Sequence, residues 1–417
     1  MSLVVMKFGG SSVGSAERIK KVAERIIEKK REGHQCVVVV SAMGDTTDEL
    51  VDLCNQLTDH PPAREMDMLL STGEQVSMSL LSMSIQHMGY RAISLTGWQS
   101  GMTTDCNHGN AKIVNIKPNR IYKALEEEKI VIIAGFQGLS EEGEISTLGR
   151  GGSDTTAVAL AAAINADLCE IYTDVDGVYS TDPRIVRVAQ KLDEISYEEM
   201  LELAQLGAAV LHPRAVEYAK NYNVPLVVRS SFSHREGTLV MEGNAVEKSM
   251  VVRGIAYDKN VARISVLEVE DIPGILATVF GALADAGIDV DIIVQSGVRN
   301  GAADFSFSIA NTDVEKAMVV MEELRSTVTF REVTYETDLV KVSIVGAGMV
   351  SNPGVAAKMF RVISQQEVSI KLVSTSEIKT SCVIDRDKLT EVILALHTAY
   401  GLDANQQAFV GGPKERR

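Results

Sequence analysis

The sequence predicts an α/β protein, in which a parallel sheet carries helices on both faces, followed by a smaller unit that occurs twice. Two observations lead to this fold class. Short apolar runs alternate with stretches of helical periodicity over roughly the first 245 residues, which is typical of parallel strands joined by helices. Beyond residue 245 a pattern recurs at an offset of 80 residues without a gap, which indicates two copies of one supersecondary unit.

The first elements set the alternation. Residues 3–8 form an apolar run that ends in two glycines, and a helix is expected next, with Ser15 capping its first turn and Gly33 ending it. Its apolar residues follow the spacing of one buried stripe: Ile19, Val22, Ala23, Ile26 and Ile27. Residues 36–40 are apolar throughout, which predicts a strand that is buried on both faces.

The same alternation continues along the first 245 residues. We expect a helix from Thr46 or Thr47 whose buried side holds Leu50, Leu53, Cys54 and Leu57. A further helix is expected to begin at residues 71–74. Later strands are predicted at residues 130–134, 170–173 and 226–228, with a helix at residues 155–165.

Composition and charge exclude several classes of protein. The chain has 417 residues, and 56 acidic against 41 basic residues give a net charge of −15, which repels nucleic acid and anionic membranes. Five cysteines without C-x-x-C spacing predict neither a disulfide framework nor a cysteine-based zinc site. Because there is no signal-peptide core and no apolar run of about 18 residues, we expect a cytoplasmic protein without membrane or nucleic-acid partners.

The repeat is visible in matched positions. Pairs at the 80-residue offset include Ile264 with Ile344, Pro273-Gly274 with Pro353-Gly354, and Phe280 with Phe360. Each copy is expected to form a strand, a Pro-Gly turn, a helix and a second strand. Gly346 and Gly348 imitate the start of a dinucleotide fingerprint, but Ser351 stands where a third glycine is required, so an oxidoreductase is a weak alternative.

A glycine-rich segment at residues 7–12 joins the first strand to the first helix. Glycines let the backbone approach a ligand closely, and exposed amides beside the Lys7 ammonium suit a phosphate. The segment is not a Walker A loop, because that motif occurs nowhere in the chain. A tight turn that needs glycine for steric reasons is the alternative.

A second glycine-rich segment, residues 148–156, places three glycines around Arg150 and leads to Asp154 at an expected helix start. An arginine can bind a carboxylate or phosphate through two parallel hydrogen bonds. Asp154 could instead be only the N-cap of the helix. The combination favours a ligand site over a purely structural loop.

Other polar residues allow two interpretations. Glu74 could face a ligand or only balance a helix dipole. The carboxylates of residues 174–182 follow a strand and could face a nucleotide or its metal, or they could form turns, as Asp182 before Pro183 would. The seven histidines form no metal-binding pair, and His212 is expected to be a packed or capping residue.

Residues 6–13, 149–154, 173–179 and 374–379 together resemble the motifs of monofunctional, feedback-regulated aspartate kinases, and the resemblance covers essentially the whole chain. It implies an amino-acid-kinase-type three-layer sandwich over residues 1–245. It further implies two ferredoxin-like ACT domains, over residues 246–335 and 336–417.

The implied reaction is phosphorylation of the side-chain carboxylate of L-aspartate by ATP with Mg²⁺. Its product, 4-phospho-L-aspartate, begins lysine, threonine and methionine biosynthesis. Because that carboxylate is already ionised at pH 7, the reaction needs no general base, which agrees with the lack of a histidine site. Charge stabilisation by cations and amides would then dominate catalysis.

The resemblance also assigns roles to residues. Lys7 and Asp154 would be catalytic, with Asp154 orienting Lys7; Arg150 would bind the α-carboxylate of aspartate and Glu74 its α-amino group. The remaining substrate-binding residues would be Ser41, Thr47, Gly151, Gly152 and Ser153. The nucleotide would contact Lys7, Phe8, Gly9, Gly10, Thr173, Asp174, Tyr179, Asp182 and Arg184. No protein side chain is assigned to a metal.

One position departs from the family pattern. Ala209 stands where the family commonly has a lysine thought to touch ATP. The loss of that cation could weaken nucleotide binding, so an amino-acid sensor that has lost catalysis is one alternative. A kinase for another acyl or carbamoyl acceptor is a second alternative within the same fold.

The two repeats would bind lysine, threonine or both as effectors at the interface between copies. The first-copy side would comprise Asp271, Ile275, Leu276, Asp289, Asp291 and Gln295. The second-copy side would comprise Val355, Ala356, Ser369, Ile370, Ser376 and Glu377. ACT pairing predicts a homodimer or larger oligomer, and Met241 and Met250 could start a separate regulatory subunit, as in some relatives.

Overall fold

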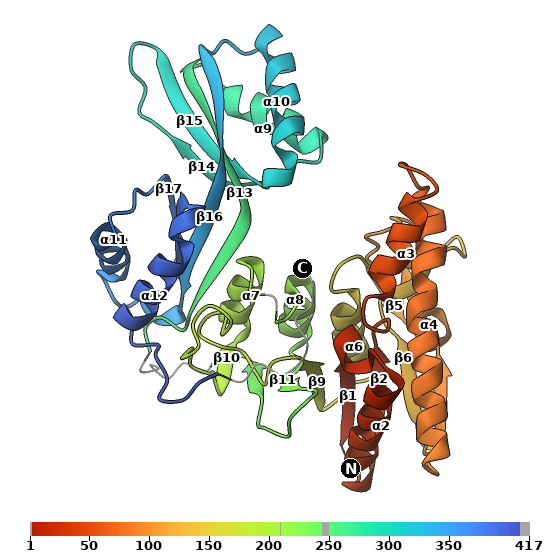
Figure 1. The fold of residues 1–417 in the computed structure, drawn as a ribbon. Helices are drawn as coiled ribbons and strands as arrows, with labels where there is room; N and C mark the ends of the chain where they lie inside the picture. Colours follow the sequence, from red (N-terminus) through yellow and green to blue (C-terminus); the bar gives the residue numbers. More distant parts are fainter. Residues whose placement is uncertain (1, 209, 244–249, 409–417) are drawn as a thin grey trace.

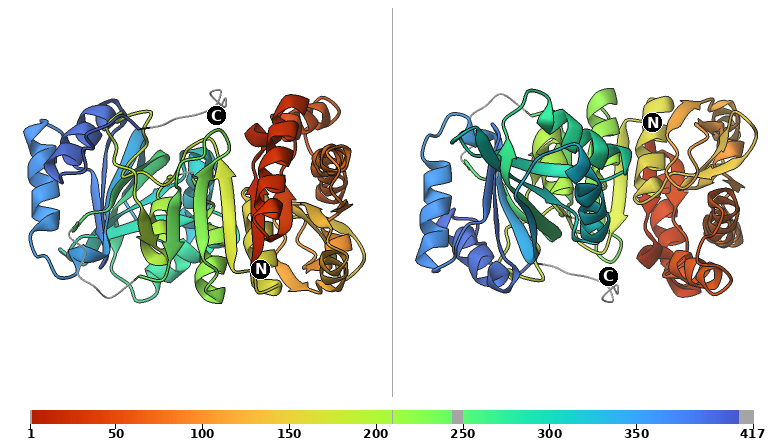
Figure 2. Two further views of the ribbon diagram at one scale, coloured as in Figure 1. Left: turned by 90° about the horizontal axis from the view of Figure 1, so that it is seen from below. Right: turned by 90° about the horizontal axis from the view of Figure 1, so that it is seen from above.

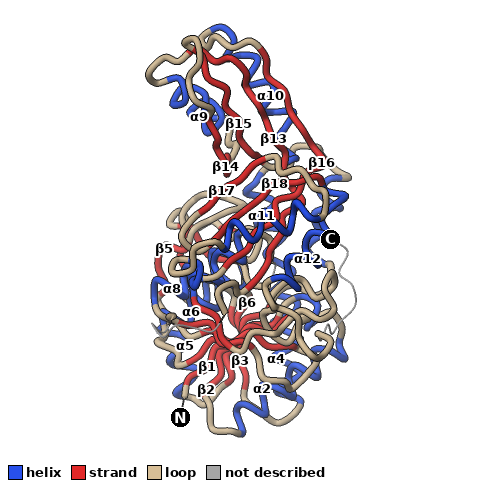
Figure 3. The backbone as a smooth tube through the Cα atoms, turned by 90° about the vertical axis from the view of Figure 1, so that its left-hand side faces the viewer, coloured by secondary structure: helices blue, strands red, loops and turns tan. Residues whose placement is uncertain are grey.

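A mixed sheet of eight strands forms the middle layer of the N-terminal domain in the computed structural model, which describes residues 2–208, 210–243 and 250–408 (Figures 1 and 3). In sheet order the strands are β10 (Glu194–Ser196), β12 (Thr238–Met241), β11 (Leu226–Ser230), β9 (Leu168–Thr173), β1 (Leu3–Phe8), β2 (Gln35–Val40), β6 (Ile130–Ala134) and β3 (Ala92–Leu95). Neighbouring strands are parallel except β11 and β12. The predicted parallel sheet is therefore confirmed, with one antiparallel exception.

Helices cover both faces of this sheet because its central strands are apolar on both sides. Met6 and Phe8 of β1 pack with α2 (Ala16–Arg31) and α4 (Ala63–His87), whereas Val5 faces the opposite helices. Those opposite helices are α5 (Asn119–Glu126), α6 (Gly152–Ala163), α7 (Tyr197–Gln205) and α8 (Pro213–Tyr222). The result is the three-layer sandwich that the resemblance implied.

Two expectations about helices were wrong. The helix expected to begin at residues 71–74 begins at Ala63. Gly73, which suggested a boundary in the sequence, lies inside α4 and lets that helix approach the turn after β2. A Cβ atom at Gly73 would lie 2.8 Å from the Cβ atom of Ala42. The apolar side of α3 (Thr46–Asn55) is not buried: α3 packs against α4, none of its residues is buried, and Leu53 is 55% exposed.

Two smaller elements complete the N-terminal domain. The four-residue helix α1 (Gly10–Val13) follows β1 directly. A four-stranded sheet packs beside α4 and contains, in order, β5 (Ile113–Ile116), β4 (Met102–Thr104), β7 (Gln137–Ser140) and β8 (Ile145–Thr147). Within the described ranges, no helix is long and apolar enough to span a membrane.

The C-terminal unit is a continuous six-stranded sheet with helices on it (Figure 1). Its strands, in order, are β14 (Val290–Gln295), β15 (Ala302–Ile309), β13 (Gly254–Glu270), β16 (Glu332–Val345), β18 (Lys379–Asp385) and β17 (Leu372–Thr375). Its helices are α9 (Ile275–Asp285), α10 (Val314–Glu323), α11 (Val355–Gln365) and α12 (Leu389–Ala399). Both α9 and α11 follow a Pro-Gly pair, as the 80-residue repeat predicts.

The long strands β13 and β16 run through both repeats. Residues 254–258 pair with residues 341–345, beside β18, whereas residues 261–267 pair with residues 332–339, beside β15. Each repeat therefore uses one half of each long strand. Figure 2 shows this unit beyond the yellow-green β9–β11 side of the N-terminal sheet, with the second repeat (blue) at the opposite end from α2 and α4.

Candidate functional site

The strand order reverses at β1, because the chain places β2, β6 and β3 on one side of it and β9 and β11 on the other. Ligands of open α/β sheets bind at such a switch point, beyond the carboxyl ends of the strands. The register sets Phe8 opposite both Val40 and Tyr172, so these three strands end together. The structure thus brings Lys7, Ser41 and Thr173 to one edge of the sheet.

An ion pair joins the two glycine-rich segments. The Nζ atom of Lys7 lies 2.7 Å from Oδ1 of Asp154, and the two side chains are only 12% and 13% exposed. Asp154 lies in the first turn of α6, and the N-cap of that helix is Gly151. The alternative in which Asp154 is the N-cap is therefore wrong, and the carboxylate instead fixes the Lys7 ammonium at the end of β1.

The backbone after β1 is tied to both neighbouring strands. The Ser41 amide donates to the Phe8 carbonyl at 3.1 Å, and the Gly44 amide donates to the Gly10 carbonyl at 3.1 Å. The Phe8 ring is fully buried and stacks on Tyr172, with 4.6 Å between ring centroids. Of the predicted nucleotide contacts, Phe8 could therefore contribute only its backbone.

Glu74 presents a buried carboxylate to the same edge from the middle of α4. Its Oε1 accepts a hydrogen bond from the Ala42 amide at 3.1 Å, whereas Oε2 has no hydrogen-bond partner among the described residues. The residue is 3% exposed, and this burial raises its pKa to about 8, although the Ala42 hydrogen bond opposes the shift. At pH 7 the group is mostly neutral and can ionise when a cation binds.

Arg150 stands on the loop immediately before α6. Its side chain is exposed and makes no hydrogen bond or ion pair within the described ranges, so its five N–H donors are available to a ligand. The next residue, Gly151, has φ of +65°, and a Cβ atom there would lie 2.1 Å from the His212 ring. His212 accepts a hydrogen bond from the Arg214 amide, which confirms the expected capping role, and burial lowers its pKa.

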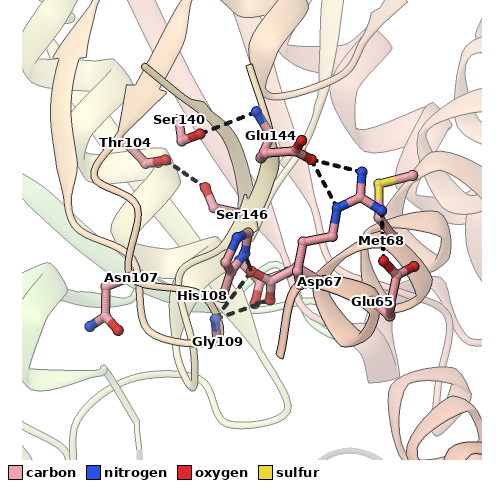
Figure 4. A network of polar contacts seen from close by, with 12 residues as sticks. Glu65, Asp67, Met68, Thr104, Asn107, His108, Gly109, Ser140, Glu144 and Ser146 are labelled. Atoms are coloured by element: carbon pink, nitrogen blue, oxygen red, sulfur yellow. Dashed lines mark hydrogen bonds and ion pairs between the residues drawn. The ribbon is translucent and has the colours of Figure 1, made fainter. Parts of the chain in front are cut away.

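The buried carboxylate of Asp67 in α4 joins the end of β8, just before this loop, to the segment at residues 108–109 (Figure 4). Asp67 has no exposed surface and accepts hydrogen bonds from the Thr147 hydroxyl at 2.5 Å and from the Gly109 amide at 3.1 Å. Nδ1 of His108 lies 2.7 Å from its other oxygen. The loop bearing Arg150 is therefore anchored at Thr147.

Arg214 of α8 supplies a second anchor. Its guanidinium donates to the Leu148 carbonyl at 2.6 Å and to the Ala111 carbonyl at 2.9 Å. Sequence reasoning missed both anchors. For Asp67 the only signal was an acidic residue within a mostly apolar helix pattern, and for Arg214 it was an arginine after His-Pro. Neither signal reveals a partner far along the chain.

A separate cavity of about 670 Å³, including its open mouth, lies beyond β9. Among the predicted nucleotide contacts, Asp174, Tyr179, Asp182 and Arg184 line it. The Arg184 guanidinium is 2.7 Å from the Asp174 carboxylate, and the Arg184 amide donates to Oδ1 of Asp182, so Asp182 also forms the expected turn. Thr173 precedes this wall and donates to Asp174.

The far wall of this cavity comes from another part of the chain. Ile255, Ala256 and Tyr257 of β13 line it, and the Tyr257 hydroxyl donates to Oδ2 of Asp182 at 3.0 Å. None of these three residues was among the predicted nucleotide contacts, because they belong to the segment assigned to the first repeat. Ala209, on which the departure from the family pattern was argued, lies outside the described residues.

The expected effector residues fall into two groups. Ile275, Leu276, Val355 and Ala356 are half-buried at the starts of α9 and α11, as is Ile370 before β17. The other residues are exposed: Asp271, Asp289, Asp291, Gln295, Ser369, Ser376 and Glu377. Figures 1 and 3 place α9 and α11 in different halves of the unit, so one chain does not close both helix starts into one site. Asp291 is 2.5 Å from the ammonium of Lys341, a buried residue that the sequence analysis missed.

The chain matches the amino acid kinase family over residues 2–230, and ACT domains over residues 262–328 and 342–400. It is 57% identical over 402 residues to an aspartokinase of Geobacillus stearothermophilus, covering 96% of this chain and 98% of that protein. It is 53% identical to aspartokinase 2 of Bacillus subtilis, covering 98% of this chain and all of that protein.

The chain belongs to the aspartokinase family. It is therefore a kinase with ACT regulatory domains. Its structure matches that of E. coli aspartokinase III in complex with aspartate and ADP, with a TM-score of 0.81, 26% identity, and coverage of 95% of this chain and 99% of that one. The same aspartokinase in complex with lysine and aspartate matches with a TM-score of 0.73 at 27% identity, over 95% of this chain and 99% of that one.

We predict that Asp67→Asn lowers the free energy of unfolding by about 2–3 kcal/mol, because an amide NH₂ would face donors that the carboxylate now accepts from. The control is Glu65→Gln in the same helix, whose 62% exposed carboxylate forms a surface ion pair, and which should cost less than about 1 kcal/mol. Urea unfolding of both variants measures the difference. Equal stability losses would contradict the anchoring role of Asp67.

Proposed function

We propose that this aspartokinase transfers the γ-phosphoryl group of ATP to the side-chain carboxylate of L-aspartate and releases 4-phospho-L-aspartate and ADP. The observation that carries the proposal is the Lys7–Asp154 ion pair, which joins the two glycine-rich segments at the switch point of the sheet. Arg150 lies on the loop just before the helix that bears Asp154, and a cavity lined by four of the expected nucleotide contacts lies beyond β9. The aspartokinase relatives and the E. coli complex with aspartate and ADP support the same reaction.

On the substrate side, Arg150 would bind the α-carboxylate of aspartate and Glu74 its α-ammonium group. Arg150 suits this role because its side chain is exposed and has no polar partner within the described ranges. Glu74 suits it because its buried Oε2 lacks a hydrogen-bond partner there. The other expected substrate-binding residues stand at three places: the end of β2 (Ser41), the start of α3 (Thr47) and the start of α6 (Gly151, Gly152 and Ser153).

Two anions must approach each other for the reaction to occur. The aspartate carboxylate is ionised at pH 7, so it can attack the γ-phosphorus without a base. Negative charge then spreads over the oxygens of the moving phosphoryl group, which Lys7 and the amides of Gly9 and Gly10 would stabilise. Asp154 would orient the Lys7 ammonium, from which it is 2.7 Å away.

The nucleotide would occupy the cavity beyond β9, in contact with Thr173, Asp174, Tyr179, Asp182 and Arg184. Within the described residues, no group of three or more His, Cys, Asp or Glu side chains could hold a metal ion. Mg²⁺ commonly keeps several waters and is bound through phosphates and one or two carboxylates. The residues present fit a Mg²⁺ ion that arrives on the triphosphate, where it would neutralise phosphate charge, and the Asp174 carboxylate in the cavity wall could be one of its ligands.

The ACT domains would bind lysine, threonine or both as end-product effectors. Exposed acids such as Asp271 and Glu377 suit an ammonium group, and a lysine complex is known for E. coli aspartokinase III. Because α9 and α11 lie in different halves of the unit, each effector site would be completed by the ACT domains of a second chain. A homodimer or larger oligomer follows, and an internal start at Met241 or Met250 could supply a separate regulatory subunit.

The reaction is tested by coupling ADP release to a spectroscopic assay with aspartate, glutamate and acetylglutamate as acceptors. We expect activity with aspartate alone. Activity with another acceptor and none with aspartate would reject the substrate. Binding of lysine or threonine without any ATP turnover would favour the amino-acid sensor instead.

Removal of the Arg150 side chain tests the clamp on the α-carboxylate. We predict that Arg150→Ala raises the KM for aspartate by about 100-fold with little change in the KM for ATP, since the lost interaction is a charge-assisted pair of hydrogen bonds. Arg150→Lys should recover only part of the affinity, because lysine cannot form the bidentate pair. An unchanged KM for aspartate in Arg150→Ala would remove this residue from the site.

The raised pKa of Glu74, about 8, predicts that aspartate binding depends on pH. At pH 7 the free group is protonated, and pairing with the substrate ammonium lowers its pKa, so binding releases about one proton. Affinity for aspartate should therefore rise with pH up to about 8 and then level off. Calorimetry at pH 7 in two buffers of different ionisation enthalpy measures the released proton. Equal release in wild type and in Glu74→Gln would contradict the assignment.

A further inference from the structure

The segment that carries the nucleotide contacts packs on the second ACT repeat. Val175, Tyr179, Val186 and Ala189 belong to one buried cluster with side chains of β16, β18, α11 and α12. The cores on the two faces of the kinase sheet form other clusters. One wall of the nucleotide cavity therefore takes its support from the regulatory unit.

A chain of hydrogen bonds passes between the same two parts at Ser180. Its hydroxyl oxygen lies 2.8 Å from Nε2 of His397 in α12, and Nδ1 of His397 lies 2.6 Å from Oδ1 of Asp403. The Gln190 amide donates to the Ser180 hydroxyl at 2.9 Å. Ser180 and His397 have no exposed surface.

These contacts fix the positions of the protons. The Asp403 carboxylate can only accept, so Nδ1 of His397 carries a hydrogen and donates it. Burial lowers the pKa of His397, although Asp403 opposes the shift, so the imidazole is neutral and Nε2 is an acceptor. The Ser180 hydroxyl then accepts from Gln190 and donates its single hydrogen to Nε2.

A Ser-His-Asp order also invites comparison with a hydrolytic triad. Nucleophilic catalysis requires that a substrate reach the serine oxygen. Ser180 has no exposed surface, and its oxygen is already engaged by both Gln190 and His397. The arrangement therefore supports a structural connection between domains.

The backbone around Ser180 strengthens that connection. The Ser180 carbonyl accepts from the Ile255 amide of β13 at 2.6 Å. Residues that follow α12 run beside the same segment, where the Ala404 amide donates to the Val188 carbonyl at 2.8 Å. Tyr179 and Thr181, the two neighbours of Ser180, both line the nucleotide cavity. A displacement of Ser180 would therefore move both of these lining residues.

We propose that His397 is a positioning residue for the nucleotide: through its hydrogen bond to Ser180, helix α12 of the second ACT repeat holds the wall of the ATP cavity in its binding conformation. This inference rests on the proposed function, because it takes the cavity beyond β9 as the nucleotide site. It adds a specific route by which the regulatory unit affects ATP binding. His397 is 217 positions away from Ser180 in the chain.

Two amide replacements at position 397 separate the two hydrogen bonds of the imidazole. His397→Gln places an amide oxygen near the position of Nε2 and can still accept from Ser180, but it loses Asp403. His397→Asn places an amide near Nδ1 and can still donate to Asp403, but it loses Ser180. Steady-state kinetics of both variants, with ATP and aspartate each varied in turn, provide the test.

We expect His397→Asn to raise the KM for ATP about fivefold or more, with the KM for aspartate unchanged and with His397→Gln close to wild type. Ser180→Ala removes the same bond from the other side and should raise the KM for ATP similarly. The double variant Ser180→Ala/His397→Asn should be no worse than the more affected single variant. If His397→Asn fails to fold, the KM for ATP of Ser180→Ala is compared with that of His397→Gln instead.

Arg184→Ala distinguishes failure of this inference from failure of the proposed function. If Arg184→Ala raises the KM for ATP but His397→Asn and Ser180→Ala leave it unchanged, the connection through Ser180 is wrong and the nucleotide site stands. If Arg184→Ala also leaves it unchanged, the cavity is not the nucleotide site. Two other results would overturn the positioning role. One is an equal rise in the KM for ATP in His397→Asn and His397→Gln. The other is a rise in the KM for aspartate as large as the rise in the KM for ATP.

Discussion

The whole arrangement depends on keeping positive charge at one edge of the sheet of an acidic protein. The chain carries a net charge of −15, and its proposed substrates are both anions, which the average surface repels. Lys7 meets this requirement because the buried end of β1 places it and Asp154 holds it. Arg150 and Arg184 are placed differently: one stands without a polar partner within the described ranges, whereas the other is paired with Asp174.

The rigid sheet makes this placement possible. Central strands β1, β2 and β9 are buried on both faces, so their carboxyl ends are fixed relative to one another by packing as well as by the parallel ladder. The backbone positions of the residues at this edge are therefore fixed. Asp67 and Arg214 also hold the loop that bears Arg150, through hydrogen bonds to Thr147 and Leu148. The backbone of the proposed site is thus held by contacts within the protein itself.

Local patterns in the sequence predicted most of the fold and the two glycine-rich segments of the candidate site, whereas the roles of its residues came from the family resemblance and stay predictions. The apolar runs and the two glycine-rich segments are short-range signals, which the structure confirms as strands, turns and helix starts. The 80-residue offset is confirmed by α9 and α11, which both follow a Pro-Gly pair. Glu74 was expected at a helix start and instead lies inside α4, because a glycine that permits close packing looks like a helix boundary in sequence. Asp67, Arg214, Lys341 and His397 were missed because each acts through a partner tens to hundreds of positions away.

The strands β13 and β16 have a consequence for how this protein can change over time. Duplication of one unit accounts for the repeat, yet each long strand now pairs in both halves of a single six-stranded sheet. Neither ACT repeat can be deleted or exchanged with that of a relative without removing part of a strand on which the other repeat depends. Selection therefore acts on the pair as one inherited piece, and a substitution that suits one half must be tolerated by the other.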